Sequence, residues 1–157
     1  MAHDTDLETG PPLEAAQPGD ETPERLAEAL TRASWRLRRS ERAELAPHGL
    51  TFAQARALRV LVEHGPMRMV DLAETLEIVA RTATARVDGL EEAGFVQRTP
   101  DPDDRRSIRV SATSDGADLI SRLAAQRRRS AESLFAPLGP SDRSELLRLL
   151  MLVTEAV

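Results

Sequence analysis

The sequence predicts a mostly α-helical fold that contains one short, charged β-hairpin. Apolar residues recur at helical spacing over most of the chain, whereas only residues 95–98 and 108–111 alternate in the manner of strands. The length of 157 residues suits one domain with one core. The hairpin directly follows a helix, and we interpret this stretch, residues 79–113, as the part that the remaining helices serve.

Composition excludes several classes of function. The chain has no cysteine, which excludes disulfides, thiol catalysis and cysteine-based redox sensing. No apolar run approaches the roughly 18 residues of a membrane helix. The N-terminus lacks the basic and apolar regions of a signal peptide. We therefore expect no membrane partner and a cytoplasmic protein.

The net charge of −5 is unevenly distributed along the chain. Residues 1–24 hold seven acids and no arginine, which leaves 21 arginines against 19 acids in the remainder. Residues 1–21 are rich in Pro, Gly and acids, so they bury too little apolar surface to offset the entropy of ordering. They are predicted to form a disordered acidic tail. A solvated extension is the simpler interpretation, and competition with DNA phosphate for a basic face is the functional one.

The first helix is predicted over residues 23–46, with Thr22 as its N-cap and Pro23 at its first position. Its apolar stripe comprises Leu26, Leu30, Ala33 and Leu37. Trp35 lies almost opposite that stripe, beside Arg39. A large aromatic residue on a polar face indicates that the face is covered, either by a second chain or by a ligand. Trp35 and Arg39 are therefore candidates for a ligand pocket as well as for a dimer contact.

Two shorter helices follow. The segment 51–54, Thr-Phe-Ala-Gln, fits a capping box that starts a helix ending near residues 65–66. The next helix is expected from about Arg68 to Leu76. Its predicted buried side comprises Val70, Leu72, Ala73 and Leu76.

The third helix of this group has two distinct faces. Its inward positions are Ala83, Val87, Leu90 and Gly94, and its outward positions are Arg81, Ala85, Asp88 and Gly89. Thr82 and Arg86 are expected on one shoulder and Thr84 on the other. Small outward residues allow a helix to enter a groove about 12 Å wide, while Arg81 and Thr82 supply donors for bases and phosphates. An ordinary surface helix is the structural alternative.

The hairpin that follows carries a turn of sequence DPDDRRS. Arg105 and Arg106 at its tip are suited to a minor groove or to phosphates, where the negative potential is high. Asp101, Asp103 and Asp104 would repel DNA unless they hold arginines in place. A surface loop of self-paired charges is the alternative for this segment taken alone.

These residues resemble the MarR family of winged helix-turn-helix regulators. Residues 101–106, DPDDRR, followed by residues 112–116, ATSDG, are similar to that family's wing signature DPxDRR and LTxxG. Residues 90–98 are similar to its LExxGLVxR segment. The resemblance implies a homodimer whose recognition helices occupy successive major grooves and whose wings reach the flanking minor grooves. It further implies that Asp104 holds the wing geometry and that Arg105 or Arg106 enters the minor groove. Ala112, in place of Leu, and Ala85, in place of a polar residue, depart from the pattern.

The remaining chain is predicted to form two helices that complete a dimerisation region. Thr113 caps a helix over about residues 114–135, with Leu119, Leu123, Ala124 and Leu134 on its apolar side. Ser141 is expected to cap the last helix, which runs to Ala156 and has more apolar surface than one neighbour requires. The arginine run 127–129 is interpreted as a solvated face or as dimer ion pairs, with a phosphate contact as the alternative.

Together these features predict a mostly α (α+β) winged helix-turn-helix protein. Residues 1–21 form the tail, and residues 22–157 form a MarR-like domain with its DNA-binding lobe over about 50–113. The dimerisation helices are expected at about 22–46 and 114–157. The residues expected to contact DNA are Arg68, Arg81, Thr82, Thr84, Ala85, Arg86, Arg105, Arg106 and Ser107.

The predicted function is sequence-specific binding of a pseudo-palindromic operator in double-stranded DNA, as a repressor released by a small aromatic or phenolic anion. A helical protein-interaction module with a winged-helix fold that does not read DNA is the alternative. An enzyme is not expected, because His48 and His64 are isolated and the sequence lacks a Gly-rich phosphate loop. We expect neither a cofactor nor a metal.

Overall fold

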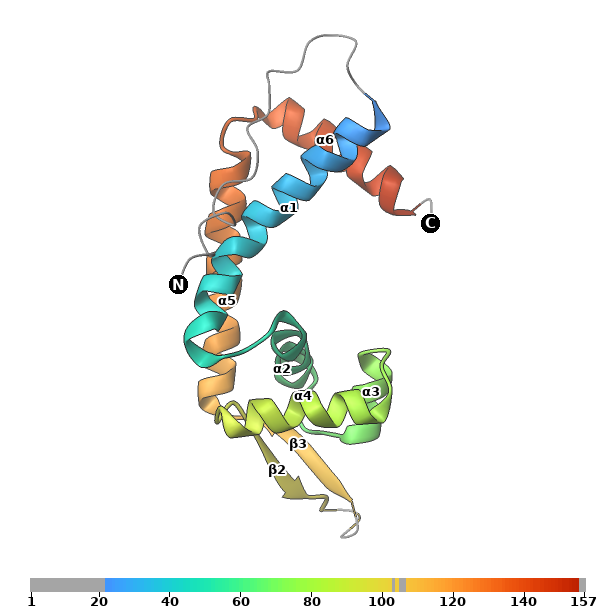
Figure 1. Ribbon diagram of the computed structural model, residues 1–157, viewed down its shortest axis with the longest axis vertical. Helices are drawn as coiled ribbons and strands as arrows, with labels where there is room; N and C mark the ends of the chain where they lie inside the picture. Colours follow the sequence, from blue (N-terminus) through green and yellow to red (C-terminus); the bar gives the residue numbers. More distant parts are fainter. Residues whose placement is uncertain (1–21, 103, 105–106, 156–157) are drawn as a thin grey trace, which may run out of the picture.

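The computed structural model describes residues 22–102, 104 and 107–155. The predicted acidic tail, Asp103 and the two wing arginines therefore lie outside the described residues. The chain has two parts: a compact lobe, and a stalk of two long helices that rises from it (Figure 1). In the order of the sequence the elements are α1 (Pro23–Leu45), a 3-10 turn η1 (Ala46–His48), α2 (Phe52–His64), β1 (Met67–Arg68), α3 (Met69–Thr75), α4 (Ala80–Glu92), β2 (Val96–Pro100), β3 (Ile108–Ala112), α5 (Ser114–Phe135) and α6 (Pro140–Glu155).

Helix starts follow the capping residues that the sequence indicated. The Thr22 hydroxyl accepts a hydrogen bond from the Arg25 backbone N–H at 3.4 Å and begins α1. At α2 the Thr51 hydroxyl accepts from the Gln54 N–H at 3.2 Å, while the Gln54 side chain accepts from the Thr51 N–H at 2.9 Å. The predicted capping box is therefore confirmed. The last helix instead starts at Pro140, so the expectation that Ser141 caps it is wrong.

The hydrophobic core occupies the lobe. Its largest fully buried apolar side chains are Leu45, Leu58, Leu61, Leu72, Leu76, Leu90, Leu119, Leu123, Val87 and Val110. These residues come from or adjoin α1, α2, α3, α4, α5 and β3, so the core fixes the mutual positions of α2, α3 and α4. Two predicted core positions are wrong, since Val70 is 57 % exposed and Ala124 is also exposed. Val70 and Ala124 both lie in helices, and helical spacing alone does not decide which face of a helix packs against a neighbour.

The sheet has three antiparallel strands in the order β1-β3-β2. In β2 and β3 the residue pairs run from Val96 opposite Ala112 to Pro100 opposite Ile108, which confirms the predicted hairpin. Strand β1 was not predicted, because two residues are too few to show alternation. It places Arg68 opposite Arg109, so Arg68 precedes α3 instead of starting it.

A tight connection joins α4 to β2. The Phe95 N–H donates to the Leu90 carbonyl at 2.9 Å, and the Gly94 N–H donates to the Glu91 carbonyl at 2.9 Å, which is the hydrogen-bond pattern of a Schellman motif. Gly94 has a φ of 78°, a conformation that favours glycine. It is exposed, so the expectation that Gly94 faces the core is wrong. Its position beyond the helix end removes it from the helical wheel.

The start of α5 packs directly on this connection. Thr113, the predicted cap, accepts from the Gly116 N–H at 3.1 Å and donates its hydroxyl to the Gly94 carbonyl at 2.8 Å. The Thr113 N–H donates to the Phe95 carbonyl at 3.0 Å. A Cβ on Gly116 would lie 2.2 Å from the same Phe95 carbonyl oxygen. Only glycine at this position therefore allows α5 to approach the start of the wing so closely.

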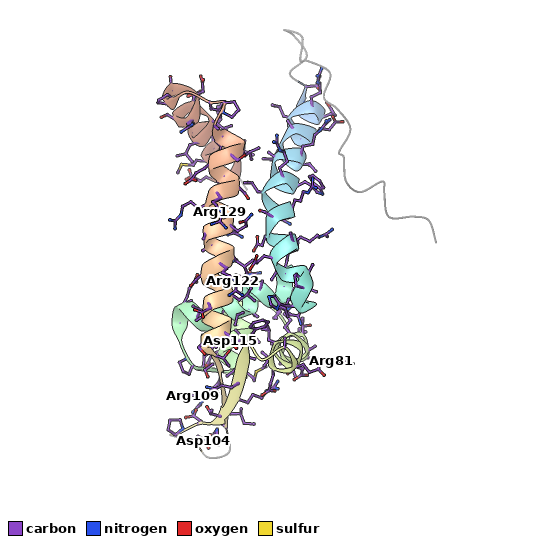
Figure 2. The ribbon with its side chains drawn as sticks, turned by 90° about the vertical axis from the view of Figure 1, so that its left-hand side faces the viewer. Arg81, Asp104, Arg109, Asp115, Arg122 and Arg129 are labelled. Carbon is purple, nitrogen blue, oxygen red and sulfur yellow. The ribbon has the colours of Figure 1, made fainter. Side chains whose placement is uncertain are left out.

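A buried carboxylate connects the stalk to the lobe. Helices α1 and α5 lie side by side above the lobe (Figure 2). Glu41 on α1 is 6 % exposed and pairs with Arg59 of α2 at 3.2 Å and with Arg127 of α5 at 3.0 Å. The predicted charge run 127–129 thus includes one arginine that forms an ion pair within the chain. Ser40 and Ser130, whose hydroxyls are 2.6 Å apart, add a second link between α1 and α5.

The far end of the stalk exposes apolar side chains. Helix α6 extends from the end of α5, and none of its described residues is buried (Figure 1). The large exposed apolar residues there and on α1 include Leu26, Leu30, Leu147, Leu149, Met151, Leu152 and Val153. Two residues of the apolar stripe predicted on the first helix, Leu26 and Leu30, are therefore uncovered within one chain. None of the helices in the described part of the chain combines the length and apolarity needed to cross a membrane.

Substitution of Gly116 by Ala tests the contact between α5 and the wing. The added methyl group would overlap the Phe95 carbonyl oxygen, so we expect a loss of about 1–3 kcal/mol in the free energy of unfolding. Chemical denaturation monitored by circular dichroism measures it. Gly139→Ala is the matched control, because the nearest atom to its added Cβ is the Asp142 carboxylate at 3.6 Å. Equal stability of the two variants would contradict the close approach.

Candidate nucleic-acid interface

Helix α4 is anchored by one face and exposes the other. Its predicted inward residues Ala83, Val87 and Leu90 are all fully buried. Arg81 and Ala85 are exposed as predicted, and Figure 2 shows Arg81 on the outer side of the lobe. The buried face prevents rotation of the helix about its own axis. The exposed face is therefore held in a fixed direction relative to the hairpin.

The shoulders of α4 carry the remaining predicted contact residues. Thr82 and Arg86 are half-buried, and Thr84 is exposed. The Thr84 hydroxyl donates to the Ala80 carbonyl at 3.0 Å, which leaves its oxygen lone pairs available as acceptors. The helix starts at Ala80, and Val79 provides no side-chain cap. The first-turn N–H groups are thus not satisfied by a capping side chain.

Gly89 has a packing role instead of the expected outward position. A Cβ there would lie 2.3 Å from the Gln54 side-chain nitrogen, and Gln54 belongs to the capping box of α2. The missing side chain lets α4 cross close to the start of α2. This close crossing explains a glycine inside a helix, where it otherwise costs about 1 kcal/mol relative to Ala. Groove entry is not needed to explain it.

Arg98 on β2 ties the wing to α4. Its guanidinium pairs with Asp88 at 2.6 Å and with Glu91, both on α4. Partial burial acts to lower the pKa of Arg98, but hydrogen bonds to Asp88 and Glu91 hold it above its ordinary value. The pairing also neutralises Asp88, the acid on the exposed face of α4. That face consequently presents less negative charge to a polyanion than its sequence suggests.

Asp101 is a buried carboxylate at the base of the wing turn. It is 1 % exposed, and one of its oxygens lies 2.7 Å from Nε of Arg68 and 3.2 Å from Nε of Arg109. The hydrogen bond to Asp101, and then the charge of Asp101, raise the pKa of Arg68. The Asp101 N–H also donates to the Ser107 carbonyl at 2.9 Å. Sequence reasoning missed this cluster, because its arginines come from two other strands.

The turn beyond Asp101 contains the predicted wing support. Asp104 accepts a hydrogen bond from the Ser107 hydroxyl at 2.7 Å, and its carbonyl accepts from the Ser107 N–H at 2.8 Å. Figure 2 shows Asp104 at the free end of the hairpin. Arg105 and Arg106 follow Asp104 in sequence and lie outside the described residues. Asp104 therefore participates in closing the turn that carries both arginines.

The structure separates the predicted site residues into three groups. Arg81, Thr82, Thr84, Ala85 and Arg86 lie on α4, and Arg68, Asp104 and Ser107 lie on the adjoining sheet and wing. Trp35 and Arg39 lie on α1 in the stalk, where the Arg39 guanidinium is 5.6 Å from the centre of the Trp35 ring. No group of three potential metal ligands occurs among the residues that the structure describes.

Comparison with known proteins identifies similar sequences and folds. The family model described as MarR family matches residues 50–108, from the start of the lobe to the first residue of β3. The HTH-type transcriptional regulator Mb0904 of Mycobacterium bovis is 34% identical over 121 residues, which cover 77% of this chain and 82% of that relative.

Two further comparisons concern a named repressor and a solved structure. The HTH-type transcriptional repressor NicR of Pseudomonas putida is 32% identical over 101 residues, or 64% of this chain and 64% of that relative, less than two thirds of its length. The crystal structure of the reduced form of MarR from E. coli superposes with a TM-score of 0.64 at 25% identity, and the match covers 82% of this chain and 95% of that chain.

Substitution of Asp101 by Ala tests the cluster at the base of the wing. Arg68 and Arg109 would lose their shared counter-charge, so we expect amide hydrogen exchange in β2 and β3 to accelerate about ten-fold or more. Exchange in the buried helix α2 should change little, which distinguishes local opening of the wing from global unfolding. Asp118→Ala, which removes an exposed acid on α5, is the matched control. Unchanged exchange in the strands would exclude a supporting role for Asp101.

Proposed function

Because this chain belongs to the MarR family of transcriptional regulators, we propose that it binds double-stranded DNA in a sequence-specific manner and acts as a repressor. The observation that carries the proposal is the position of α4 beside the wing. The exposed side of α4 bears Arg81, Thr84 and Ala85, and the hairpin adjoins the end of the same helix (Figure 2). A helix and an adjoining hairpin suit two neighbouring grooves of one duplex.

Each residue has a distinct proposed role. Arg81 and Thr82, in the first turn of α4, contact base edges in the major groove, flanked by Thr84, Ala85 and Arg86. Arg105 and Arg106 at the wing tip enter the minor groove or bind phosphates. Arg68, proposed from the sequence as a DNA contact, is paired with Asp101, so its first role is to position the wing. Its side chain remains 44% exposed and can also face a phosphate.

A homodimer would place two recognition helices on one operator. The exposed apolar residues of α1 and α6 support association of the stalks of two chains. Twofold symmetry then predicts a pseudo-palindromic operator whose half-sites are about 10–10.5 bp apart. The same proposal locates the protein in the cytoplasm with its DNA. A DNA fragment from upstream of the protein's own gene is the first operator to test, and a single half-site binding as tightly as a pair would contradict the dimer.

A small aromatic or phenolic anion is the proposed effector that releases the repressor. Trp35 offers an aromatic face, and Arg39 beside it offers a positive charge for a carboxylate. Trp35 and Arg39 both lie on the stalk. The ion pairs of Glu41 attach the stalk to the lobe, so a movement of the stalk would change the direction of α4. Binding there would change the separation of the two recognition helices in a dimer.

A protein-interaction module that does not read DNA is the competing function. The acids of the wing favoured it in the sequence. In the structure the wing acid Asp101 pairs with two arginines, and Asp88 of α4 pairs with Arg98 of the wing, so both acids serve internal contacts. Their pairing supports the DNA-binding proposal over the alternative. A gel-shift titration at increasing salt separates the two functions.

Substitution of Arg105 by Ala tests the wing. Each contact with a phosphate releases counterions from the DNA when the protein binds. Loss of one contact should therefore weaken binding and make the slope of log K against log salt shallower by about one. Fluorescence anisotropy titrations with operator DNA at several salt concentrations measure both quantities. Arg128→Ala, which removes an exposed arginine of α5, should change neither.

Arg81→Ala provides the contrast in the same titrations. It should alter the preference among operator sequences by about 1–3 kcal/mol at the base pair it contacts, with less effect on other positions. An Arg105→Ala variant with unchanged affinity and salt slope would show that the wing assignment is wrong, whatever the result for Arg81.

The effector site is tested by thermal unfolding with benzoate and its hydroxylated derivatives. An acid that binds the folded protein stabilises it by mass action and so raises Tm. We expect this rise in Tm to disappear in Trp35→Ala. Trp35→Phe keeps an aromatic face and should retain part of the shift. Equal shifts in all three proteins would place the binding site elsewhere.

A further inference from the structure

Helix α1 has an outward face on which one tryptophan is surrounded by arginines. Trp35 is 40% exposed, and Arg38, Arg39 and Arg42 are exposed as well. Positions three, four and seven residues apart lie on the same side of a helix. We call these four residues the tryptophan face. Arg39 already stacks on the Trp35 ring, with its guanidinium carbon 5.6 Å from the ring centre.

Helix α5 does not cover this face, and the apolar stripe of α1 lies on a different side of the helix. At about 100° per residue, Trp35 points roughly opposite to Leu26, and Arg42 points about 100° from the buried Glu41 that meets α5. A second chain that packs on Leu26 and Leu30 would therefore leave the tryptophan face uncovered. Among the described residues, the Trp35 ring makes no contact with another aromatic ring, and its one cation–π partner is Arg39.

The tryptophan face also has an excess of positive charge. Residues 32–42 contain five arginines and one acid, Glu41. Glu41 is buried and already pairs with Arg59 and Arg127. No carboxylate among the described residues forms an ion pair with Arg38 or Arg42. The face therefore fits an acidic chain that also carries apolar side chains.

The N-terminal segment of this chain has that composition. Residues 1–21 contain six acids, no arginine and the apolar residues Leu7 and Leu13. The segment joins α1 directly, and Trp35 lies thirteen residues beyond Thr22, about 20 Å along the helix. Twenty-one extended residues span up to about 70 Å, so the acids between Asp4 and Glu14 reach the face from the same chain.

We propose that the acidic segment 1–21 docks on the tryptophan face of α1, with its carboxylates on Arg38, Arg39 and Arg42 and its apolar residues on the Trp35 ring. Tethering supplies an effective concentration of about millimolar, which makes weak contacts sufficient. Docking holds six negative charges on the stalk, away from α4 and the wing. An aromatic anion that binds at Trp35 would then compete with the segment.

The emission of Trp35 tests the proposal without DNA, because it is the only tryptophan in the chain. Quenching by acrylamide is compared among three proteins: the full chain, a chain lacking residues 2–21, and a full-length chain with its six acids changed to their amides (Asp4→Asn, Asp6→Asn, Glu8→Gln, Glu14→Gln, Asp20→Asn and Glu21→Gln). If tethering keeps the face mostly occupied, the quenching constant rises about two-fold in both variants. The difference should vanish at 1 M NaCl, where the Debye length is about 3 Å.

A synthetic peptide of residues 1–21 provides the second arm. Added to the truncated chain, it should lower the quenching constant at low salt, and the effect should be lost in Arg38→Ala/Arg42→Ala. Arg36→Ala/Arg128→Ala removes the same charge from exposed positions outside the tryptophan face and should leave the peptide effect unchanged. Circular dichroism establishes that each variant is folded.

Two results would overturn the proposal. Equal quenching in the three proteins at low salt would show that the segment does not cover Trp35. Protection of Trp35 in the truncated chain that increases with protein concentration would show that a second copy occupies the face. Because no step involves DNA, either result leaves the proposed regulatory function untouched.

Discussion

The backbone of Phe95 is the point on which the recognition helix, the wing and the stalk all depend. Its N–H closes the end of α4, its carbonyl accepts the N–H of Thr113, and Gly116 brings α5 against the same oxygen. Three elements that belong to different parts of the molecule thus meet at the backbone of one residue. This junction and the Glu41 cluster both connect the stalk to the lobe that contains α4. The direction of α4 is therefore a property of the whole fold.

Arginine–carboxylate ion pairs connect other elements of the fold. Asp101 holds two strands, Asp88 and Glu91 hold Arg98, and Glu41 holds the stalk. Partly buried pairs of this kind are weak sources of stability, since desolvation opposes their attraction, but they restrict how the elements can be arranged. They also neutralise carboxylates that would otherwise repel a phosphate group. A chain with a net charge of −5 can in this way present a surface near α4 that is not strongly acidic.

Local signals predicted most of the helices and the hairpin correctly. The caps at Thr22, Thr51 and Thr113 are contacts within four residues, so the sequence contains all the atoms involved. Several of the errors concern partners that are distant in sequence. Strand β1 exists because β3 lies beside it, Asp101 is buried because Arg68 and Arg109 converge on it, and Gly89 is required by Gln54. Periodicity also overestimated burial at Val70, because it reports an apolar face without naming what covers that face.

The exposed helix α6 links the stability of the folded protein to its concentration. A helix of 16 residues with no buried side chain gains little from its own chain, and isolated helices of that length are marginal in water. If α6 acquires its packing only from another copy, the folded state gains stability as the concentration of protomers rises. A newly made or diluted chain then exposes leucines to proteases and chaperones, whereas an assembled one protects them. Degradation of excess single chains would follow from the same surface that builds the regulator.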